Sequence, residues 1–126
     1  MKILIVDDEQ DVETLFLQKF RKEIKSKVLE VMFAFSGEEA LRLLGEQDSP
    51  EVVYVFSDIN MPGMTGLELL EKIKSRFSHI QVSMISAYGD RDNYEKAIKS
   101  GAKGFFSKPV DFESLKQEIA ELLTNK

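Results

Sequence analysis

Val52-Val53-Tyr54-Val55-Phe56-Ser57-Asp58-Ile59-Asn60-Met61-Pro62-Gly63 is the segment from which the architecture of this chain follows. Its first five residues are valines and aromatic residues without polar alternation, a pattern typical of a strand buried on both faces of a parallel sheet. The apolar run stops at Asp58. Ligands bind beyond the carboxyl ends of the strands in such sheets, so chemistry is expected near this carboxylate. Pro62 and Gly63 predict a turn directly after it.

The segments on either side repeat the alternation of strand and helix. Apolar, strand-forming runs predict the remaining strands at 2–6, 28–35, 80–85 and 104–107. Three- and four-residue spacing of apolar side chains predicts helices over 11–25, from 36 to a break at 48–50, and over 65–77, 92–99 and 111–123. Ser36 and Thr65 are each followed three residues later by Glu, the reciprocal capping pattern of a helix start. Five strands alternating with five helices predict a doubly wound α/β fold with the flavodoxin-like strand order 2-1-3-4-5.

Length and composition limit the function further. At 126 residues the chain is expected to form one domain. A net charge of −5 argues against nucleic-acid binding by bulk electrostatics, which needs clustered Lys and Arg. The chain has no cysteine, and the apolar run at 3–6 is far shorter than a signal-peptide core or a membrane span. We therefore expect a cytoplasmic protein that binds neither membrane nor nucleic acid.

One segment departs from this acidic composition. The end of the first predicted helix and its tail carry five basic residues: Lys19, Arg21, Lys22, Lys25 and Lys27. They are compatible with a basic docking patch or with an ordinary solvated helix face, and the second interpretation is the expected one.

Polar residues follow four of the predicted strands and should meet at one edge of the sheet. They are Asp7 with Asp8, Asp58, Ser86 and Lys108. Three carboxylates brought together repel, which raises their pKa values unless a cation neutralises them, and Mg²⁺ is the hard, oxygen-binding cation that fits best. A cation, an ammonium group and a hydroxyl are what a transferring phosphoryl group requires, with Asp58 as the nucleophile.

Four stretches of the chain now point to a known family. They are Ile5-Val6-Asp7-Asp8-Glu9, Asp58-Ile59-Asn60-Met61-Pro62-Gly63-Met64-Thr65-Gly66, Ser86-Ala87 and Phe105-Phe106-Ser107-Lys108-Pro109. In this order and at these spacings they resemble the receiver domain of bacterial two-component response regulators, over essentially the whole chain. The resemblance implies that residues 1–126 form a single receiver domain, with no output domain in this chain.

The resemblance also implies roles for the residues around the acceptor. Asp58 would be the phosphoacceptor, and Lys108 and Ser86 would engage the phosphoryl group. Asp8 would bind Mg²⁺ directly and Asp7 mainly through water, with Asp58 and the backbone carbonyl of Asn60 completing the protein ligands.

Further residues would transmit and time the signal. Phe105 matches the aromatic switch that turns inward as Ser86 moves, although the family often has Tyr at this position. The missing hydroxyl favours a switch that works through packing. Asn60 and Tyr88 would flank the path of the hydrolytic water and set the lifetime of the phosphorylated state.

The partners implied by the resemblance are a sensor histidine kinase or phosphotransfer protein, and an output domain or effector protein. The latter, or a second copy of the chain, would bind the surface of the fourth predicted helix, the fifth strand and the fifth helix, roughly residues 90 to 122. The chain would not be an enzyme with an external substrate. It would catalyse only its own Mg²⁺-dependent phosphorylation and dephosphorylation.

Two other classes of protein are alternatives to a receiver domain. A phosphatase of the haloacid dehalogenase type also uses a strand-end Asp and Mg²⁺, but it normally has a second Asp where this chain has Asn60. An interaction module that works without phosphorylation would be indicated by loss of an acid or of the lysine, and none is missing.

Overall fold

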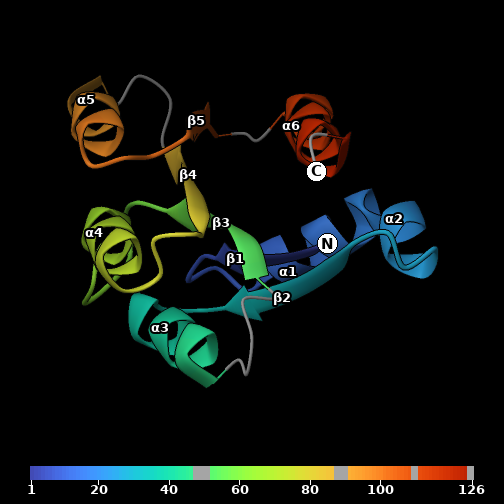
Figure 1. Ribbon diagram of the computed structural model, residues 1–126, viewed down its shortest axis with the longest axis horizontal. Helices are drawn as coiled ribbons and strands as arrows, with labels where there is room; N and C mark the ends of the chain where they lie inside the picture. Colours follow the sequence, from blue (N-terminus) through green and yellow to red (C-terminus); the bar gives the residue numbers. More distant parts are fainter. Residues whose placement is uncertain (47–51, 87–90, 109–110, 125–126) are drawn as a thin grey trace.

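The computed structural model describes residues 1–46, 52–86, 91–108 and 111–124. The strands of its central sheet are β1 (Lys2–Val6), β2 (Glu30–Ala34), β3 (Val52–Asp58), β4 (Gln81–Ser86) and β5 (Gly104–Ser107). All neighbouring strands are parallel, in the order β2-β1-β3-β4-β5 (Figure 1). The predicted flavodoxin-like order is confirmed.

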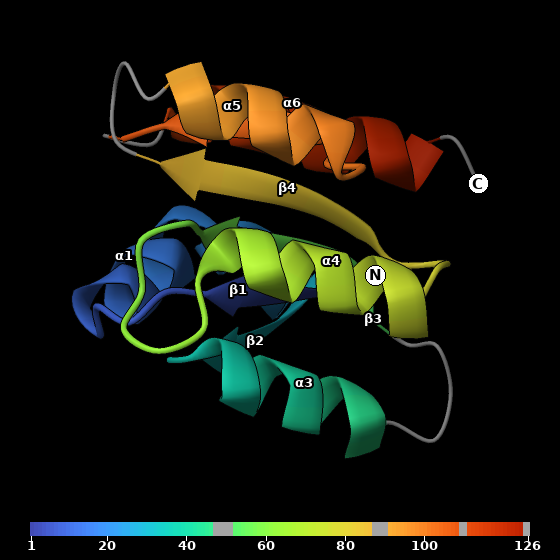
Figure 2. The same cartoon turned by 90° about the vertical axis from the view of Figure 1, so that its left-hand side faces the viewer.

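Helices cover both faces of this sheet. Those in the described residues are α1 (Asp11–Lys19), α2 (Arg21–Lys25), α3 (Gly37–Glu46), α4 (Gly66–Arg76), α5 (Arg91–Lys99) and α6 (Phe112–Thr124). Figure 1 shows α3, α4 and α5 on one face and α1, α2 and α6 on the other, and Figure 2 views the first group from the front. No helix in the described part of the chain is long and apolar enough to cross a membrane.

The first helix differs from its prediction, which was one helix over 11–25. It is divided at Phe20, whose backbone leaves helical geometry at φ −106° and ψ 19°. The Phe20 ring is buried, stacks on Phe16 at 5.8 Å and meets Phe112 of α6 edge-on at 6.3 Å. The helical periodicity of the sequence continues through this point, and the contact with α6 that accompanies the break cannot be inferred from local spacing.

Successive side chains of β1 lie on opposite faces of the sheet, so the core has two halves. Leu4 and Val6 pack with buried residues of α3, α4 and α5, whereas Ile3 and Ile5 pack with those of α1 and α6. Neither face of the strand meets water, which explains why its sequence is apolar throughout. The sheet, packed on both faces, is therefore a rigid support for the residues at the ends of its strands.

Capping follows the sequence signals closely. Thr65 and Glu68 form the complete reciprocal box at the start of α4. At α3, the Glu39 N–H donates to Ser36 Oγ at 3.0 Å, but the Glu39 carboxylate accepts from the Phe35 N–H instead of from Ser36. Both helices thus begin where the sequence predicts.

Candidate functional site

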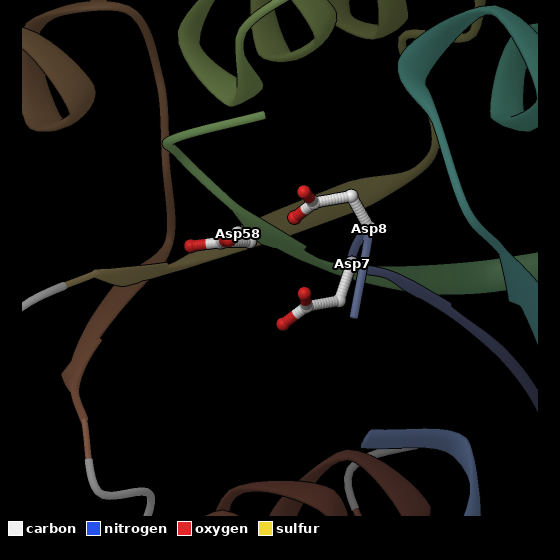
Figure 3. Close-up of side chains that lie close together, drawn as sticks. All are labelled: Asp7, Asp8 and Asp58. Atoms are coloured by element: carbon white, nitrogen blue, oxygen red, sulfur yellow. The ribbon is translucent and has the colours of Figure 1, made fainter. Parts of the chain in front are cut away.

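Three carboxylates meet at the carboxyl ends of β1 and β3. Asp58 ends β3, and Asp7 and Asp8 follow β1, which pairs directly with β3. One carboxylate oxygen from each residue lies within 4.8 Å of the others. Asp7 and Asp58 are each only 5% exposed, whereas Asp8 is exposed. Figure 3 shows the three side chains directed to the same side of the strand ends.

Lys108 reaches the same place from the end of β5. Its Nζ lies 3.4 Å from Asp7 Oδ2 and 3.4 Å from Asp58 Oδ2. Its backbone N–H donates to the Ser86 carbonyl at 2.7 Å, which ties this residue to the end of β4. The predicted meeting of acids from two strands with a lysine from a third is confirmed.

The electrostatics of the site show an excess of negative charge. The pKa of Asp58 is raised by burial and next by the Asp7 carboxylate, against an opposing effect of Lys108. Burial alone would lower the pKa of Lys108, but the charges of Asp58 and Asp7 and their hydrogen bonds outweigh it and raise the pKa. The ammonium group is therefore held charged without fully compensating the acids.

This donor set fits Mg²⁺. Three carboxylates and one ammonium group leave two net negative charges when all are ionised, and every available metal ligand is an oxygen. Asp7 Oδ1 accepts the N–H of Glu9 at 2.9 Å, which holds the carboxylate in position. Asp7, Asp8 and Asp58 are thus the residues that could hold the ion.

The other predicted site residues lie as follows. Ser86 is fully buried at the end of β4, one residue beyond Ile85, the partner of Asp58 in the sheet. Asn60 is exposed just after β3, and Tyr88 lies outside the described residues. Their roles in binding and in signal lifetime stay predictions.

Phe105 occupies the predicted switch position in β5. It is half-buried, packs against the core beneath α3, α4 and α5, and meets Tyr94 of α5 edge-on at 5.3 Å. This packing links β5 to α5, although an inward rotation of the ring stays a prediction.

Gly66 is a site residue that sequence reasoning missed. A Cβ built on it would lie 2.1 Å from the carbonyl oxygen of Asp58 and 2.8 Å from Cα of Ile59. Its N–H donates to the Ile59 carbonyl at 2.8 Å, so α4 begins directly against the backbone that carries the acceptor. A glycine directly after the capping Thr65, where alanine would form helix better, was the available signal.

A polar cluster of Tyr54, Ser83 and Glu118 was also missed. The Tyr54 hydroxyl, four residues before Asp58 on β3, is hydrogen-bonded to Ser83 of β4 and donates to Glu118 Oε1 of α6 at 3.0 Å. Burial raises the pKa of this hydroxyl, so it stays protonated. The cluster joins β3, β4 and α6, whereas the sequence predicted only an apolar strand here.

Comparison with known proteins agrees with the fold and indicates a signalling domain. Residues 3–120 match the family model described as the response regulator receiver domain. The chain belongs to this family and is therefore a receiver domain of two-component signalling.

Individual relatives cover the chain almost completely. It is 31% identical over 125 residues to sporulation initiation phosphotransferase F of Bacillus subtilis, covering 99% of this chain and 95% of that protein. It is 32% identical over 126 residues to a cyclic di-GMP phosphodiesterase of Thermotoga maritima, but spans only 32% of that protein's length. The crystal structure of a receiver domain protein from Clostridium thermocellum matches with a TM-score of 0.79 and 31% identity, over 98% of this chain and 94% of the other.

Proposed function

We propose that Asp58 accepts a phosphoryl group from a phosphohistidine of a sensor histidine kinase or phosphotransfer protein. The observation that supports this most directly is the position of Lys108, whose Nζ lies 3.4 Å from both Asp58 and Asp7 beside the three clustered carboxylates. Receiver domains are regulatory phosphoacceptors, and this chain retains each charged group that such chemistry requires.

In the proposed reaction, a carboxylate oxygen of Asp58 attacks phosphorus. The new O–P bond forms as the P–N bond breaks, and the electron pair of that bond stays on the imidazole nitrogen, which takes up a proton. The Lys108 ammonium group offsets negative charge on the phosphoryl oxygens. Mg²⁺, held by Asp7, Asp8, Asp58 and the Asn60 carbonyl, would supply further charge neutralisation when bound.

Signalling would follow from the added charge. The Ser86 hydroxyl would turn toward the phosphoryl oxygens, and Phe105 would rotate into the space that this leaves. Because Phe105 contacts Tyr94, its rotation would change the surface of α5, β5 and α6. Hydrolysis of the acyl phosphate, along a path flanked by Asn60 and Tyr88, would end the signal.

That surface is the proposed contact for an output domain, an effector protein or a second copy of the chain. Residues 1–126 would act as one receiver domain, in the cytoplasm, where the kinase phosphohistidine is presented. Regulation would reach other molecules through protein contacts, without direct binding to nucleic acid or membrane.

A small phosphodonor tests this function. Incubation with acetyl phosphate and Mg²⁺ should add the mass of one phosphoryl group, and hydroxylamine should remove it, since acyl phosphates are cleaved by this nucleophile. Sustained turnover of a phosphomonoester, without a retained phosphoryl group, would favour the phosphatase alternative instead.

Mg²⁺ should also stabilise the folded chain, because the carboxylates cluster only when it is folded. At a hundredfold excess over Kd, the gain in unfolding free energy should be about 2.7 kcal/mol. Urea unfolding with and without Mg²⁺ measures it. In Asp8→Ala, which removes an exposed ligand, the gain should shrink. Equal gains in both proteins, or no response to Mg²⁺, would contradict a metal site at these residues.

A further inference from the structure

A groove lies at the opposite edge of the sheet from Asp58. Its volume is about 420 Å³, and it is lined by Leu17, Ile24, Lys27, Leu29, Glu30 and Val31. These residues come from α1, α2, the connection between α2 and β2, and the start of β2. Since all strands are parallel, β2 begins at the edge away from the end of β3. We call this site the basic groove, after Lys27 and the basic segment that precedes it.

The segment that contributes Ile24 and Lys27 to the basic groove has uncompensated positive charge. Residues 19–27 contain five basic residues and one acid in a chain of net charge −5. The acid, Glu23, is 3.8 Å from Lys116 of α6, and Glu30 of the groove is 3.9 Å from Lys2. All five basic residues of this segment are exposed and form no ion pair within the described residues. They are Lys19, Arg21, Lys22, Lys25 and Lys27.

The backbone of Lys27 provides a second, independent observation. Its φ is +63°, in the left-handed region, where glycine is favoured after a helix because a Cβ is strained there. The Lys27 N–H donates to the Ile24 carbonyl at 3.1 Å and closes α2. The chain thus retains a lysine where glycine would fit better, and this side chain lines the groove. Strained positions of this kind point to a functional constraint.

We propose that the basic groove binds an acidic segment of a partner protein, with one large apolar side chain of that segment inserted and its carboxylates bound by Lys27 and the other basic residues of 19–27. Leu17, 44% exposed, and the half-buried Ile24 supply apolar contact. A concave site favours a single inserted side chain over a flat lipid surface. The groove lining contains no aromatic side chain on which a base could stack, which disfavours nucleic acid.

Defined peptides test the chemistry. The probe is a short fluorescein-labelled peptide of Glu and Ala around a central Phe, and the matched peptides replace Glu by Lys or Phe by Ala. Fluorescence anisotropy with the full chain should show binding of the first peptide, and binding at least about tenfold weaker for the other two. Raising the salt concentration should weaken binding, because exposed charges are screened.

Two matched variants locate the site. Leu17 and Ile98 are both 44% exposed, on α1 and on α5. Leu17→Gln should weaken binding of the acidic peptide by about tenfold or more, whereas Ile98→Gln should leave it unchanged. Lys27→Gly should raise the melting temperature by about 3 °C as the left-handed strain is relieved, yet weaken binding several-fold. If Lys27 had only a structural role, its replacement would not raise the melting temperature and weaken peptide binding together.

Several outcomes would overturn the proposal. Equal binding to Leu17→Gln and Ile98→Gln would place the peptide elsewhere. Binding to phosphatidylglycerol vesicles but not to the acidic peptide would assign the groove to a lipid surface. A dimer in analytical ultracentrifugation that is lost in Leu17→Gln would make the occupant a second copy of this chain. None of these measurements depends on phosphorylation of Asp58.

Discussion

Asp58→Ala should abolish phosphorylation by acetyl phosphate, because it removes the carboxylate oxygen that would form the O–P bond. The neighbouring Asp7 and Asp8 do not replace it in this proposal. Asp7 is held by the Glu9 N–H and by Lys108, whereas Asp8 is exposed to solvent. Intact-mass spectrometry after incubation with Mg²⁺ should show no added phosphoryl group, against one in the parent protein.

The matched control for this experiment is Asp92→Ala, which removes an exposed carboxylate from the first turn of α5. Its labelling should equal that of the parent. If Asp58→Ala were labelled as well as the parent, the assignment of the acceptor would be wrong, and peptide mapping would identify the residue that takes the phosphoryl group.

Gly66→Ala should destabilise the chain by about 3 kcal/mol or more, at the upper end of the effect of overpacking. The added Cβ would lie 2.1 Å from the Asp58 carbonyl oxygen and 2.8 Å from Ile59 Cα. These are backbone atoms and cannot rotate away, so either α4 or the end of β3 must move. A shift of β3 would displace the Asp58 carboxylate, and phosphorylation should slow as well.

Gly45→Ala is the control, because a Cβ on Gly45 meets nothing within 4 Å. Gly45 lies within α3, where alanine is the better helix former, so this variant should gain about 0.5–1 kcal/mol. Urea unfolding of both variants measures the difference. Similar stabilities for the two would show that α4 is not packed against the acceptor as tightly as the structure indicates.

Much of the site was predictable because each of its residues comes at the end of an apolar run that predicts a strand. Apolar runs that end in Asp7, Asp58, Ser86 and Lys108 define strand ends, and the parallel topology brings such ends to one edge. The spacing of apolar residues and the strand order were therefore enough to predict that acids and a lysine would meet. They did not predict the 3.4 Å contacts of Lys108, which depend on where β5 ends relative to β4.

The amino-acid pattern alone settled the doubly wound fold, the strand order and the residues gathered at the acidic edge. These features depend on where apolar residues occur and on how they are spaced, and both can be read from local sequence. Contacts between distant segments decided the rest: the break at Phe20 beneath α6, the close approach of Gly66 to Asp58, and the groove beside Lys27. Each arises where two elements come within van der Waals distance, and residue spacing along one element does not encode that distance.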